Sequence, residues 1–333
     1  MQRRHFLQIA GGTAGAVLTD TLINPWNSNA QGKSPKIVIG YPAVTPALPL
    51  YLALEKGYFR RLGLDVEAIA FANPQQVVEG IIAGKIQAAG NGVSSGNLAI
   101  GEDKSPGYFK IICSNSSNTK FVLEQFVVAK DSPIQQINEL NGQKVCSGLG
   151  PQNVALAKAI LAKNGCPDAQ IVPLSFDKHI AALTSGEVAA AYTLEPVGTV
   201  GRVENKTRTL EAGVVSKYIL GDPLAPWFGG SAAISTSFLR EYPDVAQKFI
   251  TAYRRGVMEV RRSPLISRRY LQRYTQIQPA LTRQVPLPDY RMFDEFSTED
   301  VNYFQQFFDF LTSEKVLTRK VDVLPLLLRK DAI

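Results

Sequence analysis

Histidine is scarce in this chain, which has only His5 and His179 among its 333 residues. A Ser-His-Asp triad, a Cys-His pair or a histidine-rich metal site would have to use His179, because His5 lies at the extreme N-terminus. We expect His179 at the surface, since it follows Lys178 at a polar helix start. The scarcity argues against a hydrolase or a metalloenzyme. Carboxylate and tyrosine chemistry stay open, but we predict no enzyme, no cofactor and no metal.

Cysteine is also sparse. Cys113, Cys146 and Cys166 make an odd number with no C-x-x-C spacing. A small secreted scaffold would use an even and dense set. We therefore expect free, buried thiols, with a Cys146–Cys166 bridge as the alternative.

Long apolar runs are missing as well, since no stretch reaches the roughly 20 uncharged residues of a membrane span. The apolar segment 6–18 is shorter and follows the pair Arg3-Arg4. This order resembles the twin-arginine export signal of bacteria. Small residues at 28–30 favour cleavage after Ala30. We predict a signal peptide over 1–30 and a soluble periplasmic protein; a chance arginine pair is the alternative.

The chain is basic, with a formal charge of +7, and most of its cations are scattered. One local cluster runs from Arg254-Arg255 through Arg261-Arg262 to Arg268-Arg269. The pattern around it is that of an amphipathic helix, without aromatic residues placed to stack on bases. A solvated helix face is therefore favoured over a nucleic-acid site, and docking of a partner protein is the alternative.

Short apolar strands alternate with helical segments, which predicts an α/β fold with a mostly parallel sheet. The predicted strands cover 36–40, 64–71, 86–90, 109–113, 126–129, 143–146, 171–174, 188–193 and 230–235. Everything after 243 reads as helical, including a helix capped by Thr298. That helix carries an aromatic stripe at core spacing, namely Tyr303, Phe304, Phe307, Phe308 and Leu311. About 300 residues after the signal suit two lobes.

Three segments carry a family resemblance. Residues 39–67 contain Gly57-Tyr58-Phe59 and then a Gly-Leu-Asp-Val-Glu phrase, 78–92 form a helix–strand–loop unit, and 181–196 end in Glu195-Pro196. They resemble the periplasmic solute-binding proteins of ABC importers, in the nitrate, sulfonate, taurine and bicarbonate group that also holds binders of thiamine-precursor pyrimidines. Gln87 and Ala190 stand where that group usually has aspartate. The resemblance covers about 36 to 260.

The resemblance implies a two-lobe periplasmic-binding-protein fold of type II, with two hinge crossings and a ligand cleft between the lobes. Lobe one would comprise 36–124 and 226–333, and lobe two 125–225. The crossings would fall near 121–127 and 227–235. The implied function is a receptor, expected to be monomeric, that captures a small sulfonate-like or heterocyclic solute and delivers it to an ABC permease in the inner membrane. An exported sensor-input subunit and a pyrimidine-synthase-like enzyme are the alternatives, although such synthases carry a cysteine cluster and several histidines.

Ligands of open parallel sheets sit outside the carboxyl ends of the strands. Four predicted loops follow strands there, at 41–47, 91–95, 114–117 and 147–153. The helices starting at Ser94 and Pro151 would offer backbone N–H donors that suit an oxyanion, and glycines 92, 148 and 150 would admit a ligand close to the backbone. The alternative is that these are ordinary turn and cap residues.

The side chains of Tyr192, Glu195 and Trp227 are the more distinctive candidates. Glu195 could accept hydrogen bonds from a ligand amine or serve as a helix-start carboxylate, and Trp227 could wall the pocket or pack at the hinge. No arginine lies in these loops, which argues against a bidentate clamp. The predicted ligand-binding residues are Tyr41, Pro46, Ala47, Asn91, Gly92, Ser94, Ser114, Asn115, Gly150, Gln152, Asn153, Tyr192, Glu195, Trp227 and Gly230.

Overall fold

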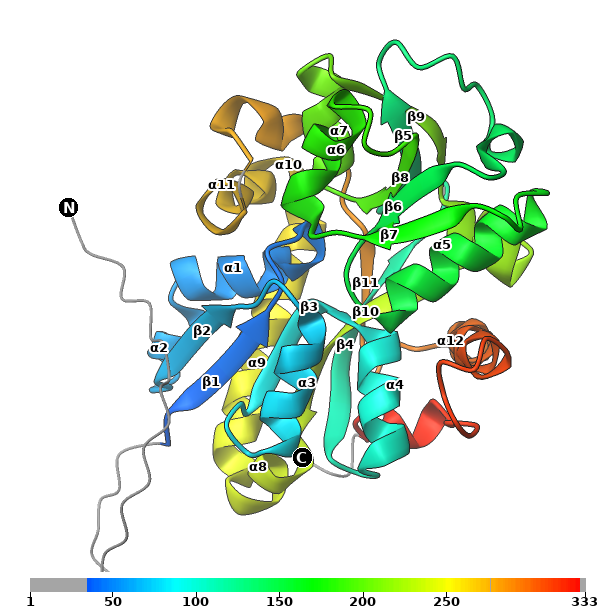
Figure 1. Cartoon of the computed structure of the whole chain (residues 1–333). Coiled ribbons are helices and arrows are strands. Elements are labelled where there is room, and N and C mark those ends of the chain that lie inside the picture. Colours follow the sequence, from blue (N-terminus) through cyan, green and yellow to red (C-terminus); the bar gives the residue numbers. More distant parts are fainter. Residues whose placement is uncertain (1–34, 276, 330–333) are drawn as a thin grey trace, which may run out of the picture. The chain divides into compact units, whose positions relative to one another are not determined.

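The computed structural model describes residues 35–275 and 277–329 (Figure 1). The predicted signal at 1–30 and its cleavage after Ala30 lie outside the described residues. Two mixed sheets with helices on their faces make up the described chain, which confirms the α/β two-lobe prediction. No helix in this part of the chain is long and apolar enough to cross a membrane.

The first lobe is built on a six-stranded sheet among the described residues, in the order β11-β4-β10-β3-β1-β2. β1 runs parallel to β2 and β3, whereas β10 lies antiparallel between β3 and β4. β11 pairs antiparallel with the far edge of β4. The strands are β1 Ile37–Tyr41, β2 Val66–Ala70, β3 Ala88–Ser94, β4 Phe109–Ser117, β10 Trp227–Ser235 and β11 Asp289–Met292.

The second lobe is built on the sheet β7-β6-β8-β5-β9. β6 runs parallel to β7 and β8, and β5 lies antiparallel between β8 and β9. In both sheets an antiparallel strand lies beside three parallel strands; it is β10 in the first sheet and β5 in the second. Each of these two strands directly follows a segment that comes from the other lobe. The strands are β5 Glu124–Ala129, β6 Lys144–Ser147, β7 Gln170–Pro173, β8 Ala190–Leu194 and β9 Thr207–Ala212.

Helices connect the parallel strands and cover the sheets (Figure 1). Their starts follow local chemistry: Asn73 accepts a hydrogen bond from the backbone nitrogen of Gln75 at 3.0 Å, with Pro74 in the first turn, as predicted. The helices are α1 Leu48–Glu55, α2 Tyr58–Arg61, α3 Pro74–Ile82, α4 Ser95–Lys104, α5 Pro151–Lys163, α6 His179–Thr184, α7 Val197–Val203, α8 Thr236–Glu241, α9 Pro243–Arg262, α10 Pro264–Ser267, α11 Leu271–Tyr274 and α12 Thr298–Ser313.

Most of the aromatic stripe of α12 packs into the core as predicted, whereas Tyr303 is only partly buried. Phe304, Phe307, Phe308 and Leu311 are fully buried. The helix is capped by Ser297 rather than by Thr298, since the Ser297 hydroxyl accepts from the backbone nitrogen of Asp300 at 3.0 Å. Cys113, Cys146 and Cys166 are free and buried, as expected.

The surface prediction for His179 is wrong, because its side chain is completely buried. α6 packs against β5 and β8, so its first residue points inward. One ring nitrogen, Nε2, lies 3.2 Å from the carbonyl oxygen of Leu174, and burial lowers the pKa of the imidazole.

The arginine cluster lies on α9 and just beyond it, and only part of it is a solvated face. Arg254 pairs with Asp294 at 2.8 Å and Arg261 pairs with Glu295 at 2.6 Å. These pairs hold α9 against the turn after β11, while Arg255 and Arg262 stay exposed. β11 itself corrects the expectation that everything after 243 is helical, and β9 was not predicted.

Residues 118–123 and 213–226 connect the two sheets. The sequence predicts crossings near 121–127 and 227–235; both connections lie slightly earlier in the chain, because residues 124–127 belong to β5 and residues 227–235 form β10 inside the first sheet. The two connections are joined to each other: the backbone nitrogen of Thr119 donates to the carbonyl of Pro223 at 3.0 Å, and the Asn118 amide donates to the carbonyl of Leu224 at 2.8 Å.

Candidate ligand-binding site

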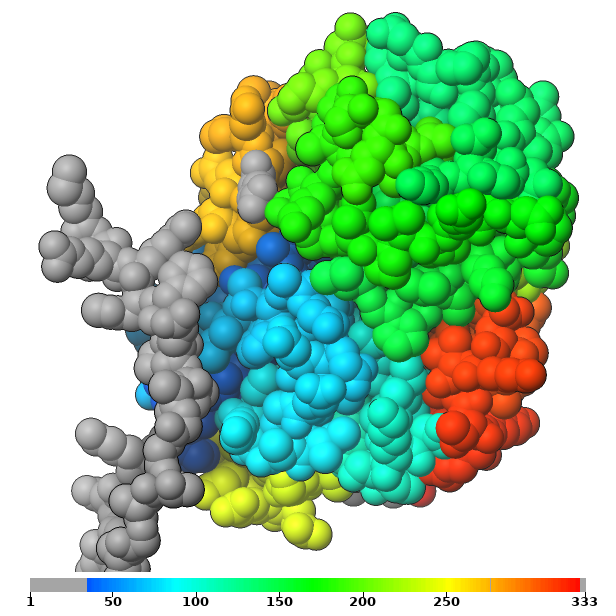
Figure 2. Space-filling view, in the orientation of Figure 1, coloured from blue at the N-terminus to red at the C-terminus, as the bar shows by residue number. Residues whose placement is uncertain are grey.

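A cavity of about 560 Å³ lies between the two lobes, outside the carboxyl ends of the parallel strands. Figure 2 shows the surfaces of the lobes, blue to cyan and green, meeting along one boundary. Residues after β1 and β2 and in the last part of β3 form much of the wall from the first lobe, and residues after β6, β7 and β8 form the opposite wall. The position agrees with the edge of the sheet where the sequence places the site.

Nine of the fifteen predicted site residues line this cavity. They come from both lobes and from β10, and their role in binding stays a prediction. They are Pro46, Gly92, Ser94, Asn115, Gln152, Asn153, Glu195, Trp227 and Gly230.

The other six do not line the cavity. Asn91 is fixed by Tyr253, whose hydroxyl donates to Asn91 Oδ1 at 2.8 Å and accepts from the Asn91 backbone nitrogen at 3.0 Å. The Ser114 hydroxyl lies 2.7 Å from that of Ser231. Both residues belong to strands rather than to the expected loops. The remaining four are Tyr41, Ala47, Gly150 and Tyr192.

Those four also have structural contacts. Tyr41 packs edge-on against Tyr51 with ring centroids 5.5 Å apart, and Tyr192 packs on Phe126 at 5.4 Å. Ala47 is buried in front of α1. Gly150 precedes α5 with a φ of 100°, which a side chain would disfavour.

Gln152 connects the lobes at the cavity wall. Its Oε1 accepts from the backbone nitrogen of Gly96 and from the Ser94 hydroxyl, each at 2.7 Å, and its Nε2 donates to the carbonyl of Gly229 at 3.1 Å. Ser94 in turn caps α4 by accepting from the Asn97 nitrogen at 3.1 Å. The helix start that the sequence offers to an oxyanion therefore already carries an oxygen acceptor from the second lobe.

Glu195 follows β8 and takes the helix-start role, while its role toward a ligand amine stays a prediction. Its Oε2 accepts from the backbone nitrogen of Thr199 in the first turn of α7 at 3.1 Å, and its Oε1 accepts from Gln125 Nε2 at 2.7 Å. The same side chain, only 1% exposed, lines the cavity. Burial raises the pKa of the carboxyl, while the hydrogen bonds from Thr199 and Gln125 oppose that rise.

Two buried hydrogen-bond donors on the cavity wall have no partner among the described residues. They are Trp227 Nε1 and Asn115 Nδ2, and both side chains are at most 2% exposed. Trp227 also packs edge-on against Phe307 at 5.8 Å, so it both lines the cavity and anchors in the core. Asn115 Oδ1 accepts from the Gly92 nitrogen at 3.2 Å, which orients the amide. Buried donors without partners are rare in folded proteins, so a ligand or water is expected on them.

Several lining residues were missed from the sequence. Phe71 follows β2, and Ser175, Phe176 and Asp177 follow β7. The rule that ligands sit at the carboxyl ends of parallel strands would have found them if applied to every predicted strand. Ile277, which reaches the cavity from beyond α11, carries no such signal.

The charged side chains on the wall are Asp177, Glu195 and Glu204, and none of the described lining residues is lysine, arginine or histidine. No group of three histidine, cysteine or acidic side chains that could hold a metal ion occurs in the described part of the chain.

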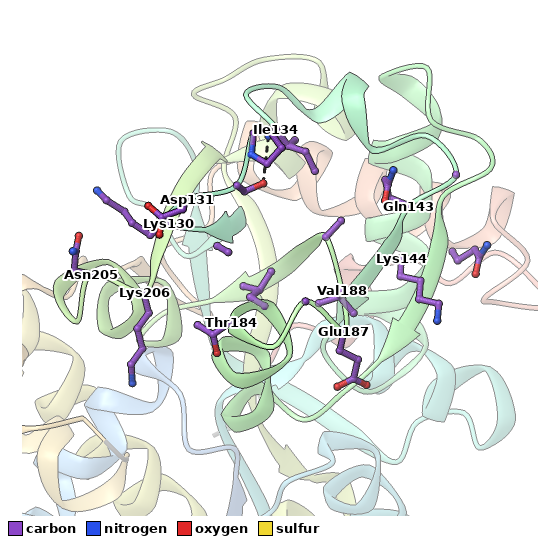
Figure 3. A pocket seen from close by; sticks show the side chains of 18 residues that line it. Lys130, Asp131, Ile134, Gln143, Lys144, Thr184, Glu187, Val188, Asn205 and Lys206 are labelled. Carbon is purple, nitrogen blue, oxygen red and sulfur yellow. Dashed lines mark hydrogen bonds between the residues drawn. The ribbon is translucent and has the colours of Figure 1, made fainter.

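A second hollow lies on the second lobe alone, at the opposite ends of its strands, and is lined by Lys130, Lys144 and Lys206 among others (Figure 3). The three lysine side chains point in different directions and do not meet. They therefore form no common binding point, and the cavity between the lobes is the better candidate site.

Two mixed sheets of matching strand order, joined by two connections with a cavity between them, define the two-lobe periplasmic-binding-protein fold. The alkanesulfonate-binding protein SsuA from Xanthomonas axonopodis pv. citri, bound to MOPS, is 18% identical with a TM-score of 0.71, over 90% of this chain and 100% of its own. The periplasmic aliphatic sulphonate-binding protein SsuA from Escherichia coli is 17% identical with a TM-score of 0.70, over 89% and 93%. The desulfurization enzyme DszB is 13% identical with a TM-score of 0.62, over 89% and 97%.

These identities show a shared fold. The chain belongs to the NMT1/THI5-like family, whose family model matches residues 45–265. Among curated protein sequences, none matches this chain.

Proposed function

We propose that this protein is an extracytoplasmic receptor that captures a small organic solute between its lobes and delivers it to an ABC permease. The observation that carries the proposal is the cavity itself. It has the size of a small-molecule site, both lobes build it, and two buried donors and one buried carboxyl face it. Family membership and the solved SsuA structures support the same function.

The finer assignments form part of the proposal. The lobes comprise 36–124 with 226–333, and 125–225. The chain is exported by the twin-arginine route, loses its signal after about Ala30, and works in the periplasm as a monomer. The solute is sulfonate-like or heterocyclic.

A receptor is favoured over an enzyme, although DszB has the same fold. Burial raises the pKa of the Cys113 and Cys146 thiols to about 12, so neither is a ready nucleophile. The buried imidazole of His179 does not line the cavity. A sensor-input subunit would use the same cleft, and genes for a permease and an ATPase beside this one would favour import.

A thermal-shift screen tests the proposal. The panel holds alkyl and aryl sulfonates, taurine, nitrate, bicarbonate, pyrimidines and aromatic carboxylates and amines. A solute at about 100 times its dissociation constant adds about 2.7 kcal/mol of stability, which is easily seen. We expect at least one hit that mass spectrometry recovers unchanged after incubation. Chemical conversion of the hit would establish an enzyme instead, and a flat response across the panel would contradict the receptor.

A further inference from the structure

The charged side chains of the cavity wall are all acidic. Asp177, Glu195 and Glu204 are its charged members, and no basic side chain joins them among the described lining residues. Two cations lie nearby but outside the wall. Arg202 donates to the Thr199 hydroxyl at 3.2 Å, and Lys206 pairs with Glu204 at 2.8 Å, which leaves Asp177 and Glu195 without an ion pair within the wall.

We infer that the solute of this cleft carries a positively charged nitrogen on an apolar or aromatic body. The inference rests on the proposed receptor function and narrows its solute class. Among sulfonate-like and heterocyclic solutes, it selects those with a protonated or quaternary nitrogen.

Glu195 is the anchor for that nitrogen. Its carboxylate has about four lone-pair positions, and Gln125 and Thr199 occupy two of them. The two donors come from β5 and α7, so they hold the carboxylate in place before the solute arrives. A buried carboxylate is costly unless it is paired, and a bound cation supplies the missing partner. Asp177 is exposed at the cavity, where it attracts a cation from solution.

The rest of the wall suits an apolar body. Phe71 and Phe176 line it from opposite lobes, and Trp227 lies on β10. Aromatic faces attract cations as well as flat apolar groups, so these rings favour the same solute as the carboxylates. The unpartnered donors Trp227 Nε1 and Asn115 Nδ2 add places for one or two acceptor atoms on that body.

An anion without a basic nitrogen would meet like charges on this wall. The helix start of α4, which would suit an oxyanion, is occupied by Gln152 Oε1 through its contacts with Gly96 and Ser94. An anion at α4 would have to displace that oxygen, and an anion at α5, whose start has no side-chain cap, would still lie in a cavity whose own charges repel it.

Matched probes separate the two charges. Hexyl, phenylmethyl and naphthylmethyl bodies are each tested as the primary amine, the alcohol and the sulfonate, by calorimetry at pH 7.5 and by thermal shift. For at least one body we expect the ammonium form to bind about 10-fold or more tightly than the sulfonate. Glu195→Gln should weaken binding of the amine probe about 10-fold and leave binding of the alcohol probe nearly unchanged.

The control is Glu187→Gln, which makes the same change at an exposed position on the second hollow, and which should alter nothing. Because Glu195 is buried and its replacement could disturb folding, Asp177→Asn provides a second variant at an exposed site. This variant should bind the amine probe about threefold more weakly than the wild type does, and added salt should reduce the difference between the two affinities.

Tighter binding of the sulfonates would overturn the charge inference and leave the receptor standing. An equal loss of affinity for the amine probe in Glu195→Gln and Glu187→Gln would also overturn the charge inference. Absence of binding by every probe, together with a flat response in the wider solute screen, would remove both the inference and the receptor function.

Discussion

The side-chain oxygen of Gln152 lies 2.7 Å from the backbone nitrogen of Gly96, so a residue of the second lobe satisfies the start of a helix in the first. Gln152 also contacts Ser94 and the carbonyl of Gly229. These hydrogen bonds join the lobes at the cavity wall, so we expect them to favour a closed arrangement of the lobes over an open one.

Replacing Gln152 with alanine should shift the solute-free protein toward a more open form. The variant loses three hydrogen bonds between the lobes, each worth about 1 kcal/mol. Small-angle X-ray scattering should show a larger radius of gyration than for the wild type. Gln143→Ala, at an exposed position of the second lobe, is the control. Identical radii for all three proteins would show that Gln152 does not hold the lobes together.

Glu124 should make stability depend on pH. It is fully buried at the start of β5, where its carboxyl accepts from the Ser117 hydroxyl at 2.8 Å and from the Val215 nitrogen at 3.3 Å, so it links the end of β4 in the first lobe to the connection 213–226. Burial raises its pKa from 4.5 to about 7, while the hydrogen bonds oppose the rise. The folded state therefore holds a proton that the unfolded state releases above its own lower pKa.

The sign follows from that difference. The contribution of Glu124 is fully present below about pH 4.5 and is lost as the pH rises through about 7, with an amplitude on the order of 3 kcal/mol. Urea unfolding at pH 5 and pH 8 measures it. Glu124→Gln should flatten the dependence, and Glu187→Gln should not. The pKa of Glu195 is also raised, so it makes stability fall with rising pH in the wild type and in both variants alike, and the measurement is made without solute. If the pH dependence of stability is unchanged in Glu124→Gln, it arises from other groups.

Gly198→Ala should damage the site from behind. A Cβ at this position in α7 would lie 1.9 Å from Gln125 Nε2, the atom that donates to Glu195. We expect a stability loss of about 1–3 kcal/mol and weaker solute binding, measured by thermal unfolding and calorimetry.

The double variant Gly198→Ala with Gln125→Ala relieves the clash, but it still lacks the side chain that donates to Glu195. Stability should partly return while binding stays weak. Full binding in either variant would mean that Gln125 does not position Glu195.

Export can be tested separately from binding. Replacing Arg3 and Arg4 with lysine should leave the precursor in the cytoplasm, which cell fractionation would show. The matched control changes the pair Arg60-Arg61 on α2 to lysine and should be exported normally. N-terminal sequencing of the exported protein locates the cleavage site. Normal export of the Arg3 and Arg4 variant would refute the twin-arginine route.

The sequence predicted the elements whose signals are local. Asn73 and Pro74 mark the start of α3, Pro151 marks α5, and the aromatic spacing of α12 identifies its buried face. The nine lining residues were found because each lies in a segment that the sequence places after a strand at one sheet edge, or on the expected crossing.

Long-range packing accounts for the misses. β11 is four residues long and mostly polar, and it is a strand because the edge of β4 offers pairing partners. β9 is half-buried along its length, so its sequence shows no clear alternation of apolar and polar residues. His179 follows a polar stretch, yet α6 turns it toward the sheet. The contact of Gln152 with Gly96 joins residues of different lobes, so no local pattern in the sequence announces it.

The insertion of β10 between β3 and β4 has a consequence for synthesis on the ribosome. β3 and β4 are complete once Ser117 has been translated, but the strand that separates them begins only at Trp227. Until Ser235 has emerged, the first sheet has a gap at its centre, and the nascent chain meanwhile supplies every strand of the second sheet. The lobe that is begun first is therefore finished last, and a chain released early would contain one completed sheet, the second, beside an unfinished first.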